Sequence, residues 1–392
     1  MRKITADYLF PVGSSPIAQG VLVVDDAGKI LSVGPRSEYQ GADLEVYSGV
    51  ITPGLVNTHC HLELSHMKGK VNTGTGLIPF ITSVVTQRNT SAELIAEAIE
   101  RAEQEMWEGG IVAVGDISNA PDTFAVKAKR RMRYYTFVEL FDFLQDAGAE
   151  KAMTDWTAVF EQLVPTPGNN TALVPHAPYS VSRTLFEKIR AFNPQRGATV
   201  SIHNQETPPE NQLFLDKTGD FIDFYDGFGI SLEQFVPTGQ PSIHYAMRHL
   251  NPDNRTLFVH NTLTTRTDIE AAHAWSPNVF WATCPNANLY IENRLPNYRH
   301  FLDTEARVTI GTDSLTSNWQ ISILEEMKTI ARYQSYVPFE VLLQWATLHG
   351  AQALGFDDTL GSLEVGKTPG LVLWEGLGSD WALRTETKVR RI

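Results

Sequence analysis

Cysteine is almost absent from this 392-residue sequence, which contains only Cys60 and Cys284. Two cysteines cannot form the disulfide framework that small secreted domains need, so a reducing compartment is the simplest expectation. No stretch approaches the roughly 20 apolar residues that a transmembrane helix requires. The opening residues, MRKITADYLFPVG, lack the continuous apolar segment of a signal peptide. We therefore expect a cytoplasmic protein that has no membrane partner.

An excess of positive charge is also missing, because the formal net charge is -13. A protein that binds nucleic acid through the phosphate backbone needs a basic face, so we expect no nucleic-acid partner. The charge fits an enzyme that acts on small neutral or cationic molecules. Apolar residues make up 42% of the chain, which is enough to build a large core. The length fits one large barrel-type domain or two domains.

Short strands broken by turn residues are predicted at both ends of the chain. Near the start, VLVV and KILSVG flank DDAG, a pattern typical of a hairpin with glycine at the turn. Near the end, GSLEVGKTPGLVLWEG contains short apolar runs separated by glycine and proline. We predict a small β domain built from residues 1–50 and 357–392, around a central domain of residues 51–356.

The central region alternates between strand-like and helix-like segments. Amphipathic stretches such as SAELIAEAIERAEQEMWEGG and SRTLFEKIRAF separate several of the apolar runs. Eight strand candidates favour an α/β fold of the (β/α)8 TIM-barrel type. An open doubly wound sheet is the alternative, but no GxGxxG follows the first strand. The candidates are GVITPGLVNTH, IVAVGDIS, RYYTFVEL, ALVPHAP, TVSIHN, TLFVHN, VFWATC and VTIGTD.

Two histidines stand one residue apart at the end of the first strand candidate. Side chains alternate between the two faces of a strand, so His59 and His61 point the same way. Cys60, between them, points to the opposite face and is expected to pack on the barrel exterior. The pair alone does not distinguish a metal site from a polar strand.

Further polar residues follow later strand candidates. His203 and His260 end two consecutive strands, Glu206 comes just after His203, and Asp313 ends the last strand. The carboxyl ends of barrel strands all meet on one face, where active sites are built. Histidine and carboxylate ligands suit zinc or iron, and a catalytic site keeps one position for water. No lysine ends the fourth strand candidate, so we expect a mononuclear site.

An ordered set of motifs covers nearly the whole chain: GVITPGLVNTHCHLELS, HAPYSVS, SIHNQE, VHN, CPNANLYI, IGTDS and GSLEVGKTPGLVL. The set resembles the amidohydrolase superfamily, in particular its deaminase and chlorohydrolase branch. The resemblance implies a (β/α)8 barrel with a small β-sandwich assembled from both ends. One departure is Gly370, where the family commonly has aspartate. It lies in the small β domain and concerns local structure instead of catalysis.

Roles for individual residues follow from the same resemblance. It implies one divalent metal per chain, zinc with iron as the alternative. Glu206 is expected to shuttle the proton to the substrate, His260 to polarise the attacking water or the tetrahedral carbon, and Asp313 to accept the water proton. The implied metal ligands are His59, His61, His203 and Asp313.

A second group of residues is expected to contact the substrate. For Glu63, a loop salt bridge or cap is as good an interpretation as substrate contact. For Asn288, a structural role is equally plausible. Trp319 is interpreted either as a stacking platform or as packing. The predicted substrate contacts are His176, Glu63, Glu139, Asn288 and Trp319.

The leading hypothesis is a hydrolytic deaminase that releases ammonia from an aminated purine base or nucleoside, such as aminodeoxyfutalosine. Next come S-adenosylhomocysteine or methylthioadenosine, then guanine or a pterin. A chlorohydrolase acting on a triazine-like ring is a second hypothesis, and a non-catalytic scaffold is a third. The partner is therefore expected to be a small aminated heterocycle, and the resemblance implies a homo-oligomer.

Overall fold

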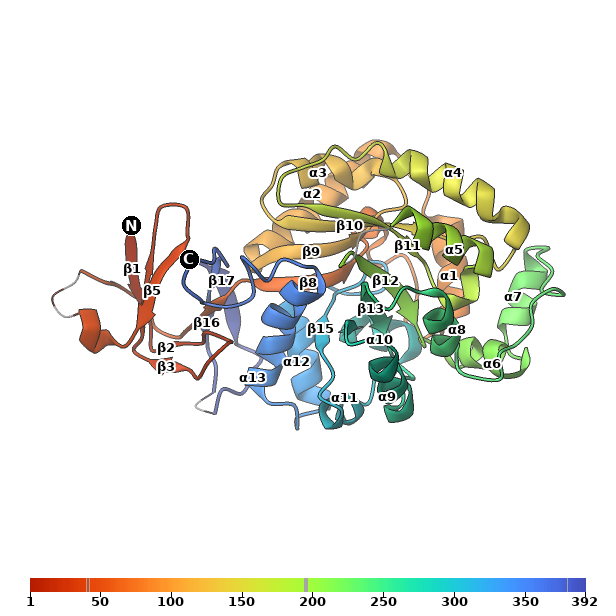
Figure 1. The fold of residues 1–392 in the computed structure, drawn as a ribbon. Helices are drawn as coiled ribbons and strands as arrows, with labels where there is room; N and C mark the ends of the chain where they lie inside the picture. The colour runs from red at the N-terminus through yellow and green to blue at the C-terminus, as the bar shows by residue number, and fades with distance from the viewer. Residues whose placement is uncertain (40, 42, 194–196, 379) are drawn as a thin grey trace.

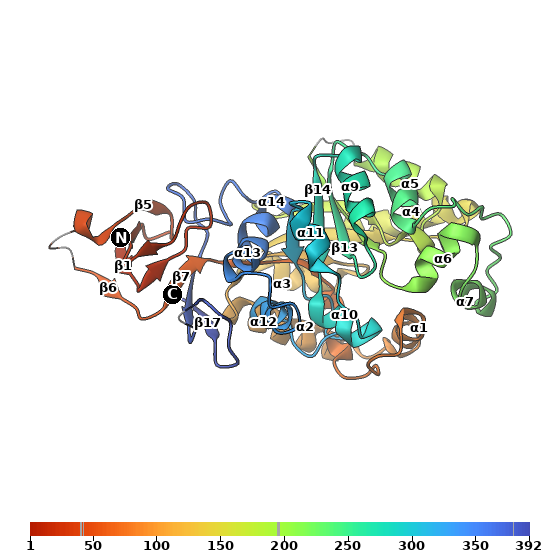
Figure 2. The same cartoon turned by 90° about the horizontal axis from the view of Figure 1, so that it is seen from below.

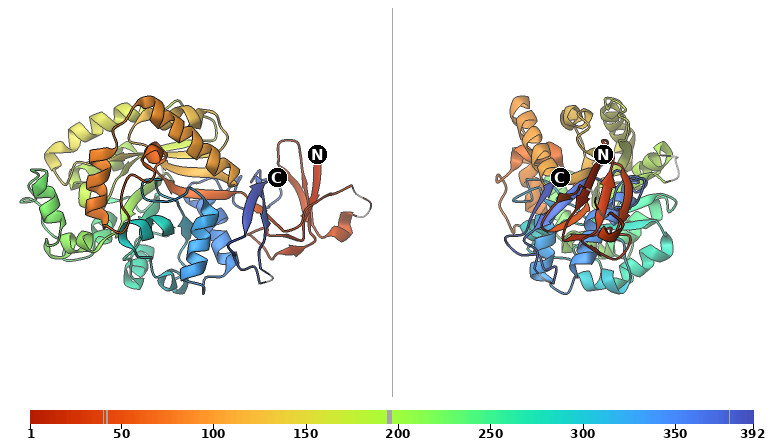
Figure 3. Two further views of the ribbon diagram at one scale, coloured as in Figure 1. Left: turned by 180° about the vertical axis from the view of Figure 1, so that it is seen from behind. Right: turned by 90° about the vertical axis from the view of Figure 1, so that its left-hand side faces the viewer.

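The structure is a computed structural model that describes residues 1–39, 41, 43–193, 197–378 and 380–392. A large body of strands wrapped by helices carries a smaller β-rich part at one end, where both termini lie (Figure 1). The view from below and the two further views show the same division (Figures 2 and 3). Among the described residues, no helix is both long and apolar enough to cross a membrane.

The large body is built on parallel strands, in two four-stranded sheets with the orders β11-β10-β9-β8 and β12-β13-β14-β15. Each strand pairs in parallel with its neighbour in the chain. The bounds are β8 (Leu55–Cys60), β9 (Ile111–Ile117), β10 (Arg133–Leu140), β11 (Asn170–Pro175), β12 (Thr199–Asn204), β13 (Arg255–His260), β14 (Val279–Thr283) and β15 (Val308–Ile310). These coincide with the eight candidates in the sequence.

Backbone hydrogen bonds join the two sheets at both seams. Between β11 and β12, the His203 N–H donates to the His176 carbonyl at 2.9 Å. Between β15 and β8, the N–H groups of Thr312 and Asp313 both donate to the His59 carbonyl at 3.0 Å. The ring of strands is thereby closed, and the prediction of an α/β TIM-type barrel is confirmed.

Helices follow most barrel strands and cover the outside of the barrel. Ser91 caps α2 by accepting a hydrogen bond from the Leu94 N–H, and the helix ends before Gly109. The helices are α1 (Leu77–Gln87), α2 (Ala92–Glu108), α3 (Phe124–Ala128), α4 (Ala149–Phe160), α5 (Arg183–Phe192), α6 (Pro208–Asp216), α7 (Phe221–Gly227), α8 (Ser242–His249), α9 (Arg266–Trp275), α10 (Pro285–Glu292), α11 (Tyr298–Asp303), α12 (Ile323–Tyr333), α13 (Phe339–Gln344) and α14 (Gly350–Ala353). The 3-10 helix η2 (Leu62–Met67) follows β8 directly.

The small part contains two sheets, with the orders β5-β4-β1-β6 and β17-β16-β7-β2-β3. The predicted hairpin is confirmed, because β4 and β5 pair in antiparallel fashion. Strands from the C-terminal end join the second sheet through the pairing of β16 with β7. The bounds are β1 (Arg2–Thr5), β2 (Tyr8–Leu9), β3 (Ile17–Ala18), β4 (Val21–Val24), β5 (Ile30–Gly34), β6 (Glu45–Val46), β7 (Val50–Pro53), β16 (Leu371–Glu375) and β17 (Lys388–Arg391).

Gly370, the departure from the family pattern, lies just before β16 at the edge of the barrel. Its φ is +68°, a backbone conformation that favours glycine. A Cβ atom at this position would come within 2.8 Å of Val112 Cγ1 on strand β9. Glycine therefore lets the small part approach the barrel closely.

Candidate metal centre and active site

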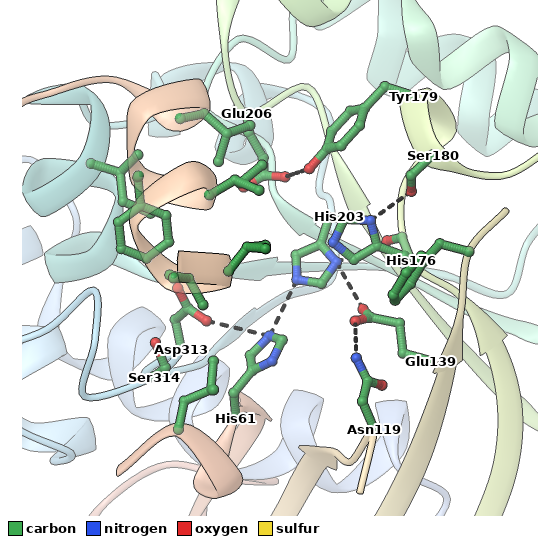
Figure 4. Close-up of a pocket in the computed structure, with 18 of the residues that line it drawn as sticks. His61, Asn119, Glu139, His176, Tyr179, Ser180, His203, Glu206, Asp313 and Ser314 are labelled. Carbon is green, nitrogen blue, oxygen red and sulfur yellow. Dashed lines mark hydrogen bonds and ion pairs between the residues drawn. The ribbon is translucent and has the colours of Figure 1, made fainter. Parts of the chain in front are cut away.

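Three imidazoles and one carboxylate meet at the carboxyl ends of the barrel strands, and Figure 4 shows the imidazoles of His61 and His203 with the carboxylate of Asp313. His61 Nε2 lies 3.2 Å from His59 Nε2 and 3.3 Å from His203 Nε2. Asp313 Oδ1 lies 3.6 Å from His59 Nε2 and 3.5 Å from His61 Nε2. The structure thus brings together the four residues that the sequence suggested as metal ligands.

The spacing of the donor atoms around His61 Nε2 fits one tetrahedral cation. Two ligands bound to zinc at 2.0–2.1 Å in a tetrahedral site lie about 3.3–3.4 Å from each other. The pairs around His61 Nε2 lie within a few tenths of an ångström of that value. Imidazole nitrogens together with a carboxylate oxygen are also the donors that zinc and iron accept. The donor set can therefore hold a single divalent metal.

A buried carboxylate orients one of the imidazoles from behind. His203 Nδ1 lies 2.8 Å from the His176 carbonyl oxygen, which can only accept, so this nitrogen carries the proton. Glu139 Oε1 lies 3.1 Å from the same nitrogen. Nε2 of His203 is consequently left with its lone pair facing the centre. A carboxylate behind a metal-binding histidine is a recurrent arrangement, because it fixes the ring and increases its basicity.

The pKa shifts of His203 and Asp313 are those of a donor set that lacks a positive charge at its centre. Burial disfavours the imidazolium form of His203, but Glu139 and Glu206 outweigh it and raise the pKa of His203 to about 10. Burial also disfavours the Asp313 carboxylate, yet the imidazoles of His59 and His61 hold the pKa of that group well below its usual range. A bound cation would compensate the negative charge of these buried carboxylates and leave the imidazoles neutral.

Left-handed backbone conformations turn the chain sharply at three strand ends. Gln205 (φ +48°), His260 (φ +70°) and Asp313 (φ +57°) all adopt positive φ, which is uncommon for residues other than glycine. Such conformations cost about 1–3 kcal/mol each and cluster at functional sites. Here they occur at the last residue of β13 and shortly after the ends of β12 and β15, next to the residues of the site.

The His260 imidazole and the Glu206 carboxyl group lie side by side next to the donor set. Asn288 Nδ2 donates to the His260 backbone carbonyl at 3.2 Å, so Asn288 Oδ1 faces His260 Nδ1 at 2.9 Å. The His260 proton is thereby placed on Nδ1, and the Nε2 lone pair faces Glu206 Oε2 at 3.4 Å. The Tyr179 hydroxyl donates to the other oxygen, Glu206 Oε1, at 3.2 Å.

Burial sets the protonation of this pair. It raises the pKa of Glu206 to about 7, so a proton is available on this carboxyl group near neutral pH. It lowers the pKa of His260 to about 4, so the imidazole is neutral at the same pH. A carboxyl group that titrates near pH 7 is suited to general acid–base chemistry.

Three of the five predicted substrate contacts line a cavity above the donor set. His176 is held by Ser180, whose Oγ lies 2.6 Å from His176 Nδ1. Glu139 lines the same cavity and contacts His203. Glu63 Oε2 accepts the backbone N–H groups of Asn119 and Ala120 at 2.8 and 3.0 Å. Glu63 therefore acts as a loop clamp, and it also borders the cavity.

The other two predicted substrate contacts, Asn288 and Trp319, do not line this cavity. Both polar groups of the Asn288 side chain are occupied by His260, because α10 begins directly after β14 and its first turn lies beneath the imidazole. Trp319 is 53% exposed and packs against Tyr290, with 5.1 Å between the ring centroids. Neither residue is among those that line the cavity.

The cavity has a volume of about 1050 Å³, its open mouth included, and one of its walls is apolar. Helix α1 supplies this wall through residues spaced as one face of a helix. Aromatic residues from the loop after β10 and from α7 contribute as well. The apolar lining consists of Leu77, Phe80, Ile81, Val84 and Val85 on α1, together with Leu64, Phe141, Phe143, Phe224 and Ile291.

Sequence reasoning missed several residues that hold the site. Tyr179 lies inside the HAPYSVS motif, three residues after His176, and that proximity was a usable signal. Ser317 donates to Asp313 Oδ2 at 2.5 Å and lies four residues further along the chain. The apolar stripe of α1 has a visible helical period, but nothing in the period indicates that it faces a cavity.

A comparison with protein families identifies the chain. The model described as "Amidohydrolase family" matches residues 50–389. The chain belongs to the amidohydrolase family. The resemblance that the motifs suggested is thus confirmed, and with it the prediction of a hydrolase that acts on carbon–nitrogen bonds.

Curated relatives of this amidohydrolase act on adenine nucleosides, according to their names. An adenosine deaminase of Helicobacter pylori is 25% identical over 325 residues, which cover 82% of this chain and 77% of the relative. A 5'-deoxyadenosine deaminase of Methanococcus vannielii is 26% identical over 368 residues, which cover 89% and 81% of the two chains.

Solved structures with the same fold include two deaminases and a chlorohydrolase. Aminofutalosine deaminase of Helicobacter pylori in complex with methylthio-coformycin has a TM-score of 0.84 at 21% identity and covers 100% of both chains. An adenosine deaminase of Xanthomonas campestris with bound zinc has a TM-score of 0.76 at 25% identity and covers 95% of this chain and 84% of its own. Atrazine chlorohydrolase of Arthrobacter aurescens, complexed with zinc, has a TM-score of 0.75 at 18% identity, with coverages of 97% and 88%.

The contact between Glu139 and His203 gives a prediction about metal affinity. Replacing Glu139 by glutamine removes the carboxylate behind the imidazole, and metal affinity should fall about 10- to 100-fold, as is usual for such partners. Competition with a chromophoric chelator measures the change. Asn119→Ala is the matched control, because Asn119 lies on the far side of Glu139, 3.4 Å from its Oε2, and does not touch His203. Equal affinities in the wild type and Glu139→Gln would contradict the assignment.

Proposed function

We propose that this amidohydrolase is a hydrolytic deaminase of 6-aminopurine nucleosides that carry an apolar group at the 5' end. Aminodeoxyfutalosine is the first candidate substrate, followed by methylthioadenosine; S-adenosylhomocysteine ranks below both, because its 5' thioether ends in a charged amino acid. The observation that carries the proposal is the position of Glu206, with a pKa of about 7, beside the four-donor set in a cavity with one apolar wall. Relatives named as deaminases of adenosine and 5'-deoxyadenosine support the same chemistry.

The apolar wall supports the choice of substituent. Ten aliphatic or phenylalanine side chains among the described residues line the cavity, and five of them form the stripe on α1. Adenosine has a hydroxyl group at its 5' position, which would lose its water there without gaining a partner. A methylthio or aryl group would instead bury apolar surface against the stripe.

One divalent metal per chain, zinc, is proposed to be held by His59, His61, His203 and Asp313. Zinc in the adenosine deaminase of Xanthomonas campestris supports this choice over iron. Such a metal lowers the pKa of the water that it binds toward neutrality and so supplies hydroxide.

The residues of the chain then handle the protons of the reaction. Glu206 delivers its proton to a ring nitrogen of the purine, which makes the adjacent amine-bearing carbon open to attack. Asp313 accepts the proton of the attacking water. His260 presents a neutral Nε2 toward the same space and is kept in that tautomer by Asn288. When the tetrahedral carbon collapses, Asp313 passes its proton to the amine, which leaves as ammonia, and the hydroxyl proton returns to Glu206 as the oxo group forms. General acid–base catalysis of this kind contributes roughly 100- to 10,000-fold.

We also propose that the two terminal sheets form a separate β-sandwich domain, with residues 1–50 and 357–392 as its parts and residues 51–356 as the catalytic barrel. Side chains from both sheets share one apolar cluster, for example Ile4 and Leu22 with Ile51 and Leu373. The enzyme is proposed to work in the cytoplasm as a homo-oligomer, on the basis of the family resemblance.

A substrate panel tests the proposed function. Zinc-loaded protein should release ammonia from aminodeoxyfutalosine or methylthioadenosine, with the change in ultraviolet absorption that accompanies amino-to-oxo conversion. Chelation should abolish the activity, and added zinc should restore it. Guanine, a pterin and a chlorotriazine, assayed for chloride in the last case, complete the panel. Ammonia from none of the amino-heterocycles would refute the proposal, and chloride from the triazine alone would favour the chlorohydrolase.

The α1 wall should control selectivity at the 5' position. Ile81→Glu places a charge on the apolar stripe, and kcat/KM for methylthioadenosine should fall about 10-fold or more, as expected when a well-packed apolar contact is lost. The same value for adenosine should change less than about 3-fold. Thr82→Glu is the matched control, because Thr82 is the next residue on α1 and does not line the cavity. Equal losses for both substrates would show that the stripe does not recognise the substituent.

The pKa of Glu206 predicts the alkaline side of the pH profile. Burial raises this pKa, so the carboxyl group is protonated below about pH 7 and ionised above it. Since the proton must be donated to the purine, log(kcat/KM) should fall with a slope of -1 as the pH rises through about 7. Glu206→Gln should lower kcat by roughly 100- to 10,000-fold. A limb at the same pH in the Glu206→Gln variant would assign the titration to another group.

A further inference from the structure

Glu206 lies in an exceptional stretch of backbone between a strand and a helix. Strand β12 ends at Asn204, Gln205 adopts the left-handed conformation with φ +48°, and helix α6 begins at Pro208. The side chains of Gln205 and Glu206 are both buried. The N–H groups of these two residues cannot pair within a strand or a helix, so they need other acceptors.

Glu210 satisfies both of these N–H groups with one carboxylate. Its Oε1 accepts the Gln205 N–H at 2.9 Å, and its Oε2 accepts the Glu206 N–H at 2.8 Å. Glu210 is fully buried in the first turn of α6. The two bonds close a small ring that ties the turn to the start of the helix.

This arrangement requires a carboxylate in particular. Two N–H donors face two oxygens, so replacing one oxygen with an NH₂ group would set donor against donor. Burial, and then the nearby Glu206, raises the pKa of Glu210 to about 7, while the two N–H bonds act in the opposite direction by stabilising the anion. Hydrogen bonds to an ionised acceptor are about twice as strong as those between neutral groups, so the turn is held firmly.

We propose that Glu210 is a positioning residue for proton transfer. By fixing the backbone of Glu206, it holds that carboxyl group between the Tyr179 hydroxyl and His260 Nε2. Glu210 does not line the cavity, so it acts through Glu206 and not on the substrate. The inference rests on the proposed function, in which Glu206 is the proton carrier.

A double-mutant cycle between Glu206 and Glu210 tests this inference. Glu210→Gln should lower kcat about 10- to 100-fold, the size expected when a catalytic group is displaced by about 1 Å. Metal content and KM should stay unchanged. The kcat of the variant Glu206→Gln/Glu210→Gln should equal that of Glu206→Gln within about 3-fold. Glu210 acts only through the Glu206 carboxyl group, which both variants lack.

Glu326→Gln is the matched control for the loss of a buried carboxylate. Glu326 is also fully buried and accepts a backbone N–H, that of Asn286 at 2.8 Å, but it does not contact Glu206. Any loss of kcat in Glu326→Gln should therefore multiply with the loss in Glu206→Gln. If Glu210→Gln does not fold, Glu210→Asp keeps the charge and can reach only one of the two N–H groups, and it replaces Glu210→Gln in the same cycle.

Two results would overturn the positioning role and leave the proposed function intact. One is wild-type kcat in Glu210→Gln, and the other is a multiplicative loss in the double variant while Glu206→Gln is strongly impaired. Full activity of Glu206→Gln would instead refute Glu206 as the proton carrier, and the positioning role would fall with it. Measuring the single variants first therefore separates the two failures.

Discussion

The candidate active site depends on the closure of the barrel, because the hydrogen bonds that close it come from residues of the site. At one seam, the His59 carbonyl accepts the N–H groups of both Thr312 and Asp313, so one proposed ligand anchors another. At the other seam, the His176 carbonyl accepts both the backbone N–H and the Nδ1–H of His203. A barrel that opened at either seam would separate the donors. The hydrogen bonds that close the barrel therefore also hold the donor set in place.

A second layer of buried polar groups supports the residues at the centre. Glu139 holds His203, Asn288 holds His260, and Ser317 holds Asp313. Each of these partners uses a hydrogen bond to choose a tautomer or a carboxylate orientation, so the central atoms face the metal or the substrate with their lone pairs. Buried polar groups are unfavourable unless they are paired, and these pairs make the site rigid, although Nδ1 of His59 has no hydrogen-bond partner among the described residues.

The barrel and its central residues could be predicted because they depend on short-range patterns. Apolar runs mark the strands, and a polar residue at the end of each run must lie on the same face of a parallel barrel. The second layer could not be predicted in this way. Asn288 was expected at the cavity, yet the first turn of α10 carries its side chain beneath His260. Sequence spacing gives the direction of a side chain within one element, and the angle at which α10 leaves β14 decides what Asn288 touches.

The apolar stripe on α1 is a second feature whose role could not be predicted from the sequence. The stripe of α1, which includes Ile81 and Val84, has the period of a helix face that packs on a core, and packing is its ordinary meaning. Instead, the stripe lines the same cavity as Glu206. Under the proposed function, the chemistry resides on the barrel strands and selectivity resides on α1, the helix that follows β8 and η2. A change of substrate within this fold requires new residues on α1 and leaves the donor set untouched.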